Sequence, residues 1–97
     1  MIMLDEDIRD AITDLERNLR YFHDLPECVK EALVNMVFNM GISRFLQFKK
    51  TLAYLKQGKY RKAGNECLDS RWATQVGYRA VEVAALIKQG ENDERTG

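Results

Sequence analysis

The stretch Ala32-Leu-Val-Asn-Met-Val-Phe-Asn-Met-Gly41 decides the fold of this chain, because it is apolar on nearly every side of a helix. Its only polar side chains, Asn35 and Asn39, lie four residues apart and so share one helical face. A helix that is apolar all round belongs inside a bundle, so the two amides either pair internally or line a cleft. Gly41 is expected to end this helix in the left-handed conformation.

Helical periodicity continues on the N-terminal side of this stretch. Apolar residues recur at helical spacing from Ile8 to Phe22, behind an acidic first turn of the kind that the helix dipole favours. Asp24 and Glu27 are expected to form a capping box, so that the central helix runs from about residue 25 to residue 40. The residues of this helix expected in the core are Leu33, Met36, Val37 and Met40.

Three more helices are expected downstream, over residues 43–57, 59–68 and 78–89. Ser43 is expected to cap the first of them, and Gly58 and Gly90 to end the first and the last. Between them, residues 70–77 are expected to be short and irregular, with Trp72 packed into the core.

These patterns predict an all-α fold, a compact orthogonal bundle of five to six short helices. Connections of two to five residues between helices of unequal length argue against an up-and-down bundle. One helical domain is expected over residues 1–90, followed by a frayed polar tail over residues 91–97, which contain no apolar side chain.

The composition sets limits on the kind of protein. The chain has 97 residues, 45% hydrophobic and 31% charged, which is typical of one globular domain. It has no apolar run of the ~18 to 20 residues that a membrane span needs, and no secretory signal is visible, so synthesis in the cytoplasm of a bacterial host is expected. Cys28 and Cys67 are expected to be small buried hydrophobes, and with His23 as the single histidine we expect no metal site and no cofactor.

Charge is unevenly distributed although the chain is neutral overall. Residues 1–31 hold nine acidic and four basic side chains, whereas residues 44–79 hold nine basic and two acidic ones. A basic half raises the local concentration of a polyanion, and peptidoglycan, lipopolysaccharide and nucleic acid all qualify. A solvated face of lysine and arginine is the equally weighted alternative.

Two motifs at matching separation suggest a family. The segment Asn35-Met-Val-Phe-Asn-Met-Gly41, followed 29 residues later by Ser70-Arg71-Trp72, resembles the C-terminal lobe of the T-even phage lysozymes, the endolysins that cut peptidoglycan. The resemblance runs from about Leu25 to about Ala80. It implies the fold of that lobe and a cell-wall target in the periplasm. Val76-Gly77 departs from the Thr-Pro that the family has before the last helix.

The resemblance also implies which residues face the substrate. Asn35 and Arg79 match a buried asparagine and the arginine that pairs with the catalytic glutamate of the other lobe. Asn39 stands where the family usually has a glutamine that contacts the glycan. Arg71 matches an arginine that reaches over the cleft mouth to an acid of the other lobe, and Gln75 matches a glutamine beside the cleft.

The catalytic residues of the family have no counterpart here. In the family a general-acid glutamate is followed by an aspartate nine residues later and a threonine six residues beyond that. The closest frames begin at Glu16, Glu31, Glu66 and Glu82, and each lacks the aspartate. The resemblance therefore implies the glycan-binding wall of a lysozyme whose catalytic lobe is missing, which is inactive alone and partnered by peptidoglycan and by a separately supplied lobe.

Two alternatives belong to other classes. Removing a lobe can expose apolar side chains such as Phe38 and Phe45, which would make the chain a homodimerising interaction module. A small helical nucleic-acid binder is the weaker alternative, because the basic half lacks the recognition helix of a helix-turn-helix.

Overall fold

The computed structural model of the protein describes residues 5–96, with the side chains of residues 8–91. This part of the chain is helical and contains no strand, so the predicted all-α class is confirmed. The helices are α1 (Asp5–Asn18), the 3-10 helix η1 (Phe22–Asp24), α2 (Glu27–Met40), α3 (Ile42–Phe45), α4 (Lys49–Gln57), α5 (Tyr60–Leu68), α6 (Arg71–Val76) and α7 (Tyr78–Thr96).

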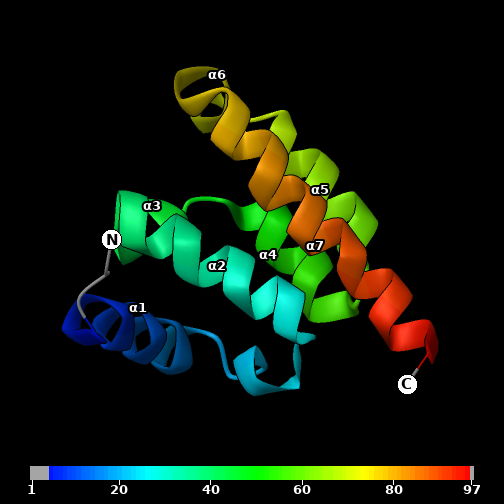
Figure 1. The fold of residues 1–97 in the computed structure, drawn as a ribbon, viewed down its shortest axis with the longest axis horizontal. Helices are drawn as coiled ribbons and strands as arrows, with labels where there is room; N and C mark the ends of the chain where they lie inside the picture. The colour runs from blue at the N-terminus through cyan, green and yellow to red at the C-terminus, as the bar shows by residue number, and fades with distance from the viewer. Residues whose placement is uncertain (1–4, 97) are drawn as a thin grey trace.

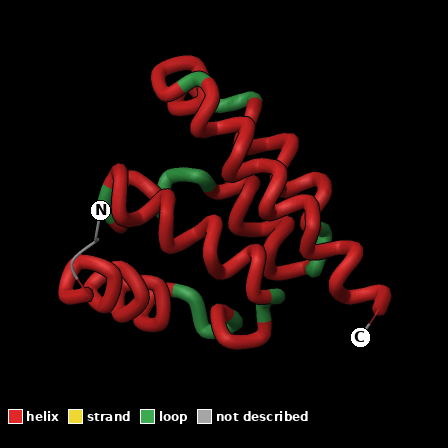
Figure 2. The backbone as a smooth tube through the Cα atoms, viewed as in Figure 1, coloured by secondary structure: helices red, strands yellow, loops and turns green. Residues whose placement is uncertain are grey.

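Helix α2 holds the centre of the fold, as its apolar sequence predicts. It packs against α1 on one side and α7 on the other, and α7 in turn packs along α5 (Figure 1). Short loops join successive helices, so neighbours in sequence are mostly neighbours in space (Figure 2). The core residues of α2 expected from the sequence are buried, with Met40 packed at its edge, and Trp72 is only 6% exposed.

The segment predicted as one helix over residues 43–57 is two helices. Ser43 lies inside α3 and caps nothing, and Phe48 leaves the helical conformation with φ −79° and ψ 62°. The Phe48 ring is stacked near Phe45, with centroids 6.5 Å apart, and meets Trp72 edge-on at 6.1 Å. These aromatic contacts hold Phe48 at the break, and Trp72 comes from a segment that is distant in sequence. As expected, Gly58 ends α4 in the left-handed conformation.

The last helix is longer than predicted. It continues through Gly90 to Thr96, so the expected end at Gly90 is wrong, and residues 91–96 are part of α7 rather than a frayed tail. Gly90 is buried where α7 meets α2 and α5, and a Cβ atom there would lie 2.5 Å from the Val29 side chain. Glu91 Oε2 accepts a hydrogen bond from the Arg61 backbone N–H at 2.7 Å, which caps the start of α5.

Three further local expectations need correction. The carboxylate of Glu27 pairs with Lys30 at 3.3 Å, and no side chain caps α2, so the capping box with Asp24 does not form. Gly41 has a positive φ of 86° but an extended ψ of 155°, outside the left-handed helical region. Residues 70–77 are not irregular, because α6 forms there. The Ser70 hydroxyl caps this helix by accepting a hydrogen bond from the Ala73 backbone N–H at 3.2 Å.

Cys67 is a free cysteine that is buried in the core. Burial raises the pKa of the Cys67 thiol from 9.0 to about 11, although a hydrogen bond with Thr51 lowers it. The unfolded chain releases this proton at a lower pH than the folded chain. Stability that is present below pH 9 is therefore lost as the pH rises toward 11.

We expect the free energy of unfolding to fall over this range by about 1.4 kcal/mol per pH unit through this thiol. Urea denaturation at steps from pH 8 to 11 measures the slope. Cys67→Ala should reduce it, whereas Cys28→Ala, which changes a half-buried thiol, should leave it intact. Equal alkaline slopes in the wild type and Cys67→Ala would contradict the assignment.

Candidate functional site

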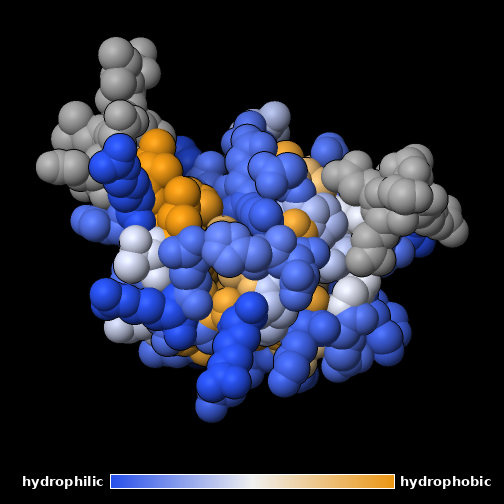
Figure 3. Space-filling view, turned by 90° about the horizontal axis from the view of Figure 1, so that it is seen from below, coloured by the Kyte–Doolittle hydropathy of each residue, from blue (hydrophilic) through white to orange (hydrophobic). Residues whose placement is uncertain are grey.

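An apolar groove runs between α1 and α2 and has a volume of about 820 Å³; we call it the α1–α2 groove. Apolar side chains line it, namely those of Ile8, Ile12, Phe22, Val34 and Phe38. Figure 3, which views the molecule from below, shows hydrophobic surface exposed among charged side chains. Phe38 is 41% exposed, a large fraction for a phenylalanine on a central helix, so part of this lining faces solvent.

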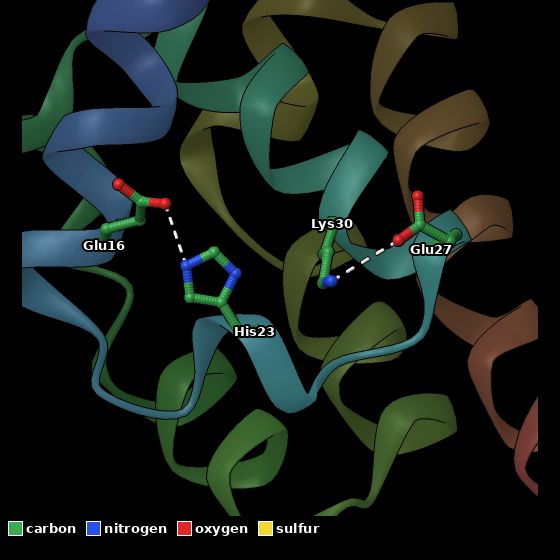
Figure 4. Close-up of polar contacts among 4 residues, drawn as sticks. All are labelled: Glu16, His23, Glu27 and Lys30. Carbon is green, nitrogen blue, oxygen red and sulfur yellow. Dashed lines mark hydrogen bonds and ion pairs between the residues drawn. The ribbon is translucent and has the colours of Figure 1, made fainter.

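Figure 4 shows two side-chain pairs beside this groove, and His23, Glu27 and Lys30 of these pairs line it. His23 Nε2 lies 2.8 Å from the carboxylate of Glu16, and Lys30 Nζ lies 3.3 Å from that of Glu27. Exposed pairs of this kind contribute little to stability. Each of these two carboxylates faces a nitrogen base, and Glu31 also lines the groove.

The other end of the groove holds three of the residues predicted from the sequence. Asn35 Oδ1 accepts hydrogen bonds from Asn39 Nδ2 at 2.7 Å and from Arg79 Nη1 at 3.1 Å. Asn39 Nδ2 also donates to the Asn35 carbonyl at 2.7 Å. The structure therefore brings Asn35 and Arg79, both assigned to the cleft by resemblance, into direct contact. We call Asn35, Asn39 and Arg79 the amide–guanidinium cluster.

Local structure explains why these three side chains meet. Asn35 and Asn39 stand one turn apart on α2, and the turn at Gly77, with φ 60°, starts α7 so that its second residue is Arg79. Arg79 is exposed, and it forms no ion pair with any carboxylate whose side chain the structure describes. A cation in the first turn of a helix opposes the helix dipole, so an added carboxylate at this point would be favoured.

The other two predicted residues lie apart from this cluster. Gln75 Oε1 accepts a hydrogen bond from Arg44 Nη2 at 3.3 Å, which joins α6 to α3. Arg71 lines a different hollow at the starts of α4 and α6. The structure thus brings together three of the five predicted residues. Arg44 was not predicted, and its place in the basic half of the sequence is the only signal that pointed to it.

The chemistry of the cluster is limited to hydrogen bonding and one positive charge. Across the described side chains, no three histidine, cysteine, aspartate or glutamate residues are grouped so that they could hold a metal ion. Within the same part of the chain, no helix is both long and apolar enough to cross a membrane. The cluster can bind an acceptor-rich or anionic group, and it contains no carboxyl, imidazole or thiol group.

Comparison with known proteins agrees with the sequence motifs and the fold. The profile of the phage lysozyme family matches residues 1–92. Two relatives from Dictyostelium discoideum, probable T4-type lysozymes 1 and 2, are 30% and 32% identical over 91 residues. Those matches cover 91% of this chain and 54% of each relative, so the chain spans about half the length of these curated relatives. The chain belongs to the phage lysozyme family.

Proposed function

We propose that this domain is the glycan-binding wall of a lysozyme that hydrolyses peptidoglycan, with the catalytic carboxyl groups supplied by a second lobe. The observation that carries the proposal is the amide–guanidinium cluster at the end of an exposed apolar groove. The family of the chain supports it, as does the absence of the Glu-x8-Asp-x5-Thr pattern from these 97 residues. The second lobe can belong to the same polypeptide or to another one.

Each member of the cluster has a separate role in this proposal. The amide of Asn39 lies at the surface and binds polar groups of the glycan, while Asn35 holds both Asn39 and Arg79 in place through its Oδ1 atom. Arg79 pairs with the catalytic glutamate of the second lobe. Arg71 and Gln75 are assigned to the substrate by resemblance and lie outside the groove, so we place them at the outer edge of the binding surface.

The α1–α2 groove provides the seat for the second lobe. Its apolar lining includes Phe38, and burying such side chains favours association by roughly 25 cal/mol per Å² of apolar surface. Because the groove leads to Arg79, a lobe seated in it can bring a carboxylate to that guanidinium. Docking and catalytic assembly are then one event.

The isolated chain should bind purified peptidoglycan without cleaving it. Co-sedimentation measures binding, and an assay for reducing ends measures cleavage. Asn39→Ala should weaken binding several-fold, because the contact with the glycan loses its hydrogen-bond donor. Asn65→Ala is the control, since Asn65 is an exposed amide on α5 outside the groove. Release of reducing ends by the chain alone, or binding indifferent to Asn39→Ala, would refute the proposal.

A homodimer is the second candidate, and the exposure of Phe38 is the observation that favours it. Phe45, which was also expected at the surface, is fully buried, so that expectation is wrong and the dimer would depend on the α1–α2 groove alone. Light scattering after size-exclusion chromatography distinguishes the two states. A dimer that dissociates in Phe38→Ala would show that a second copy occupies the groove.

A further inference from the structure

A second hollow, of about 450 Å³, lies where the starts of α4 and α6 meet; we call it the basic hollow. It shares no lining residue with the α1–α2 groove. Four cationic side chains line it, those of Arg44, Lys49, Lys50 and Arg71. Two carboxylates, those of Glu66 and Asp69, also line it, so the charged lining carries a net positive charge.

The cations of the basic hollow form no ion pair, and the two carboxylates that also line it offset only part of their charge. Within the described side chains, the ion pairs are His23 with Glu16 and Lys30 with Glu27, and none involves a cation of the hollow. Arg44 donates instead to the neutral amide of Gln75. Four like charges around one hollow repel one another, and a bound anion would relieve that repulsion.

The start of α4 adds to the same field. Lys49 and Lys50 are its first two residues, and no side chain caps its first turn. The N-terminal end of a helix carries partial positive charge and free N–H donors, so lysines there are unfavourable unless an anion is close. This helix start reinforces the four side-chain charges that define the site.

We propose that the basic hollow binds the phosphate groups of an anionic polyol phosphate polymer. One arginine guanidinium can donate two parallel hydrogen bonds to two oxygens of the same phosphate, and a lysine ammonium adds a point charge. This set of side chains therefore suits a ligand with several phosphate oxygens. A polymer adds further phosphates that the basic half of the chain attracts at longer range. The basic hollow shares Arg71 with the proposed glycan-binding wall, whereas Lys49 and Lys50 belong to the basic hollow alone, so variants of these two lysines test it separately.

The aromatic residues of the hollow argue against nucleic acid as its ligand. Proteins that bind single-stranded nucleic acid combine basic grooves with exposed aromatic rings on which bases stack. Here Phe48 packs edge-on against Trp72, with ring centroids 6.1 Å apart, and Trp72 is buried. Because the two rings pack against each other, the hollow offers charge and hydrogen bonds but no exposed ring on which a base could stack.

The test compares two double variants that remove the same charge. Lys49→Gln with Lys50→Gln empties the hollow of two cations, whereas Lys56→Gln with Lys62→Gln removes two exposed lysines that do not line it. Amide NMR titrations at constant ionic strength would use pyrophosphate, poly(glycerol phosphate) and a single-stranded oligonucleotide. We expect Kd for poly(glycerol phosphate) to rise at least tenfold in the first variant and less than threefold in the second.

In the wild type, the shifted amides should map to the starts of α4 and α6. Thermal melts of both variants check that each is folded. Equal weakening in the two variants would overturn the proposal in favour of unspecific attraction to the basic half. Binding of pyrophosphate without binding of the polymer, or tighter binding of the oligonucleotide, would overturn it as well.

Discussion

Replacing Leu33 by alanine is expected to lower the free energy of unfolding by about 2 to 5 kcal/mol. This range for buried leucines was itself established on a T-even phage lysozyme, a protein of this family. Leu33 lies in the middle of α2 and is completely buried. Removing its branched end takes apolar contacts from the helix that packs against both α1 and α7. The cavity left behind cannot close without moving one of these helices.

Urea denaturation followed by circular dichroism measures this loss. Leu33→Met keeps most of the side-chain volume and should cost less than about 1.5 kcal/mol. It therefore distinguishes the cost of the cavity from the cost of any substitution at this position. Glu31→Ala serves as a surface control on the same helix and should stay within about 0.5 kcal/mol. A loss below about 1 kcal/mol in Leu33→Ala, or a wild type that melts without cooperativity, would contradict the view that this domain closes its own core around α2.

The second large effect is expected at Arg79. If a catalytic lobe is supplied separately, Arg79→Ala should weaken the restored activity by roughly tenfold or more, because a charge-assisted hydrogen bond contributes about 1.5 to 3 kcal/mol. The measurement is the concentration of added lobe that gives half-maximal release of reducing ends. The change should leave the thermal melt of the isolated chain nearly unaltered, since Arg79 is exposed.

Two variants make this result specific. Arg61→Ala removes the same charge from an exposed position on α5 and should leave complementation intact. Arg79→Lys keeps the charge but loses the planar fork that meets both Asn35 and a carboxylate, so it should rescue only part of the loss. A loss of similar size in Arg61→Ala would mean that net charge, and not the cluster, governs docking.

The sequence predicted the centre of the fold because one signal dominated there. Few arrangements can bury a helix that is apolar on nearly every side, and an amide within it requires a polar partner. The apolar pattern placed α2 at the centre. Arg79 was assigned to the cleft by resemblance, and it meets Asn35 across 44 residues of sequence. The motifs around Asn35 and Trp72 pointed to the family that the comparisons show.

The features that sequence reasoning missed depend on contacts between distant segments. The break at Phe48 is set by packing against Trp72, which no local pattern reports. Gly90 has the signature of a helix end, but it is a point of close approach to Val29, and Glu91 then caps α5. Glycine is typical both of a helix end and of a close approach between helices, and only the positions of the neighbouring helices distinguish the two.

The candidate site was predicted in part for the same reason. All five residues were assigned by resemblance, and the hydrogen bonds of Asn35 join three of them in the amide–guanidinium cluster. Arg71 and Gln75 come from α6 and lie apart from that cluster. The basic hollow was visible in the sequence only as a charge imbalance, because its lining comes from two separate segments, residues 44–51 and 66–72.

The most direct test of the account is to measure release of reducing ends from purified peptidoglycan by three samples. One contains this chain, one contains a separately expressed phage-lysozyme lobe with the Glu-x8-Asp-x5-Thr pattern, and one contains both. We predict no release by either protein alone and clear release by the mixture, lost when the glutamate of the added lobe is replaced by glutamine. Release by this chain alone, or a mixture as inactive as its parts, would contradict the claim that this domain is one wall of a two-lobed lysozyme.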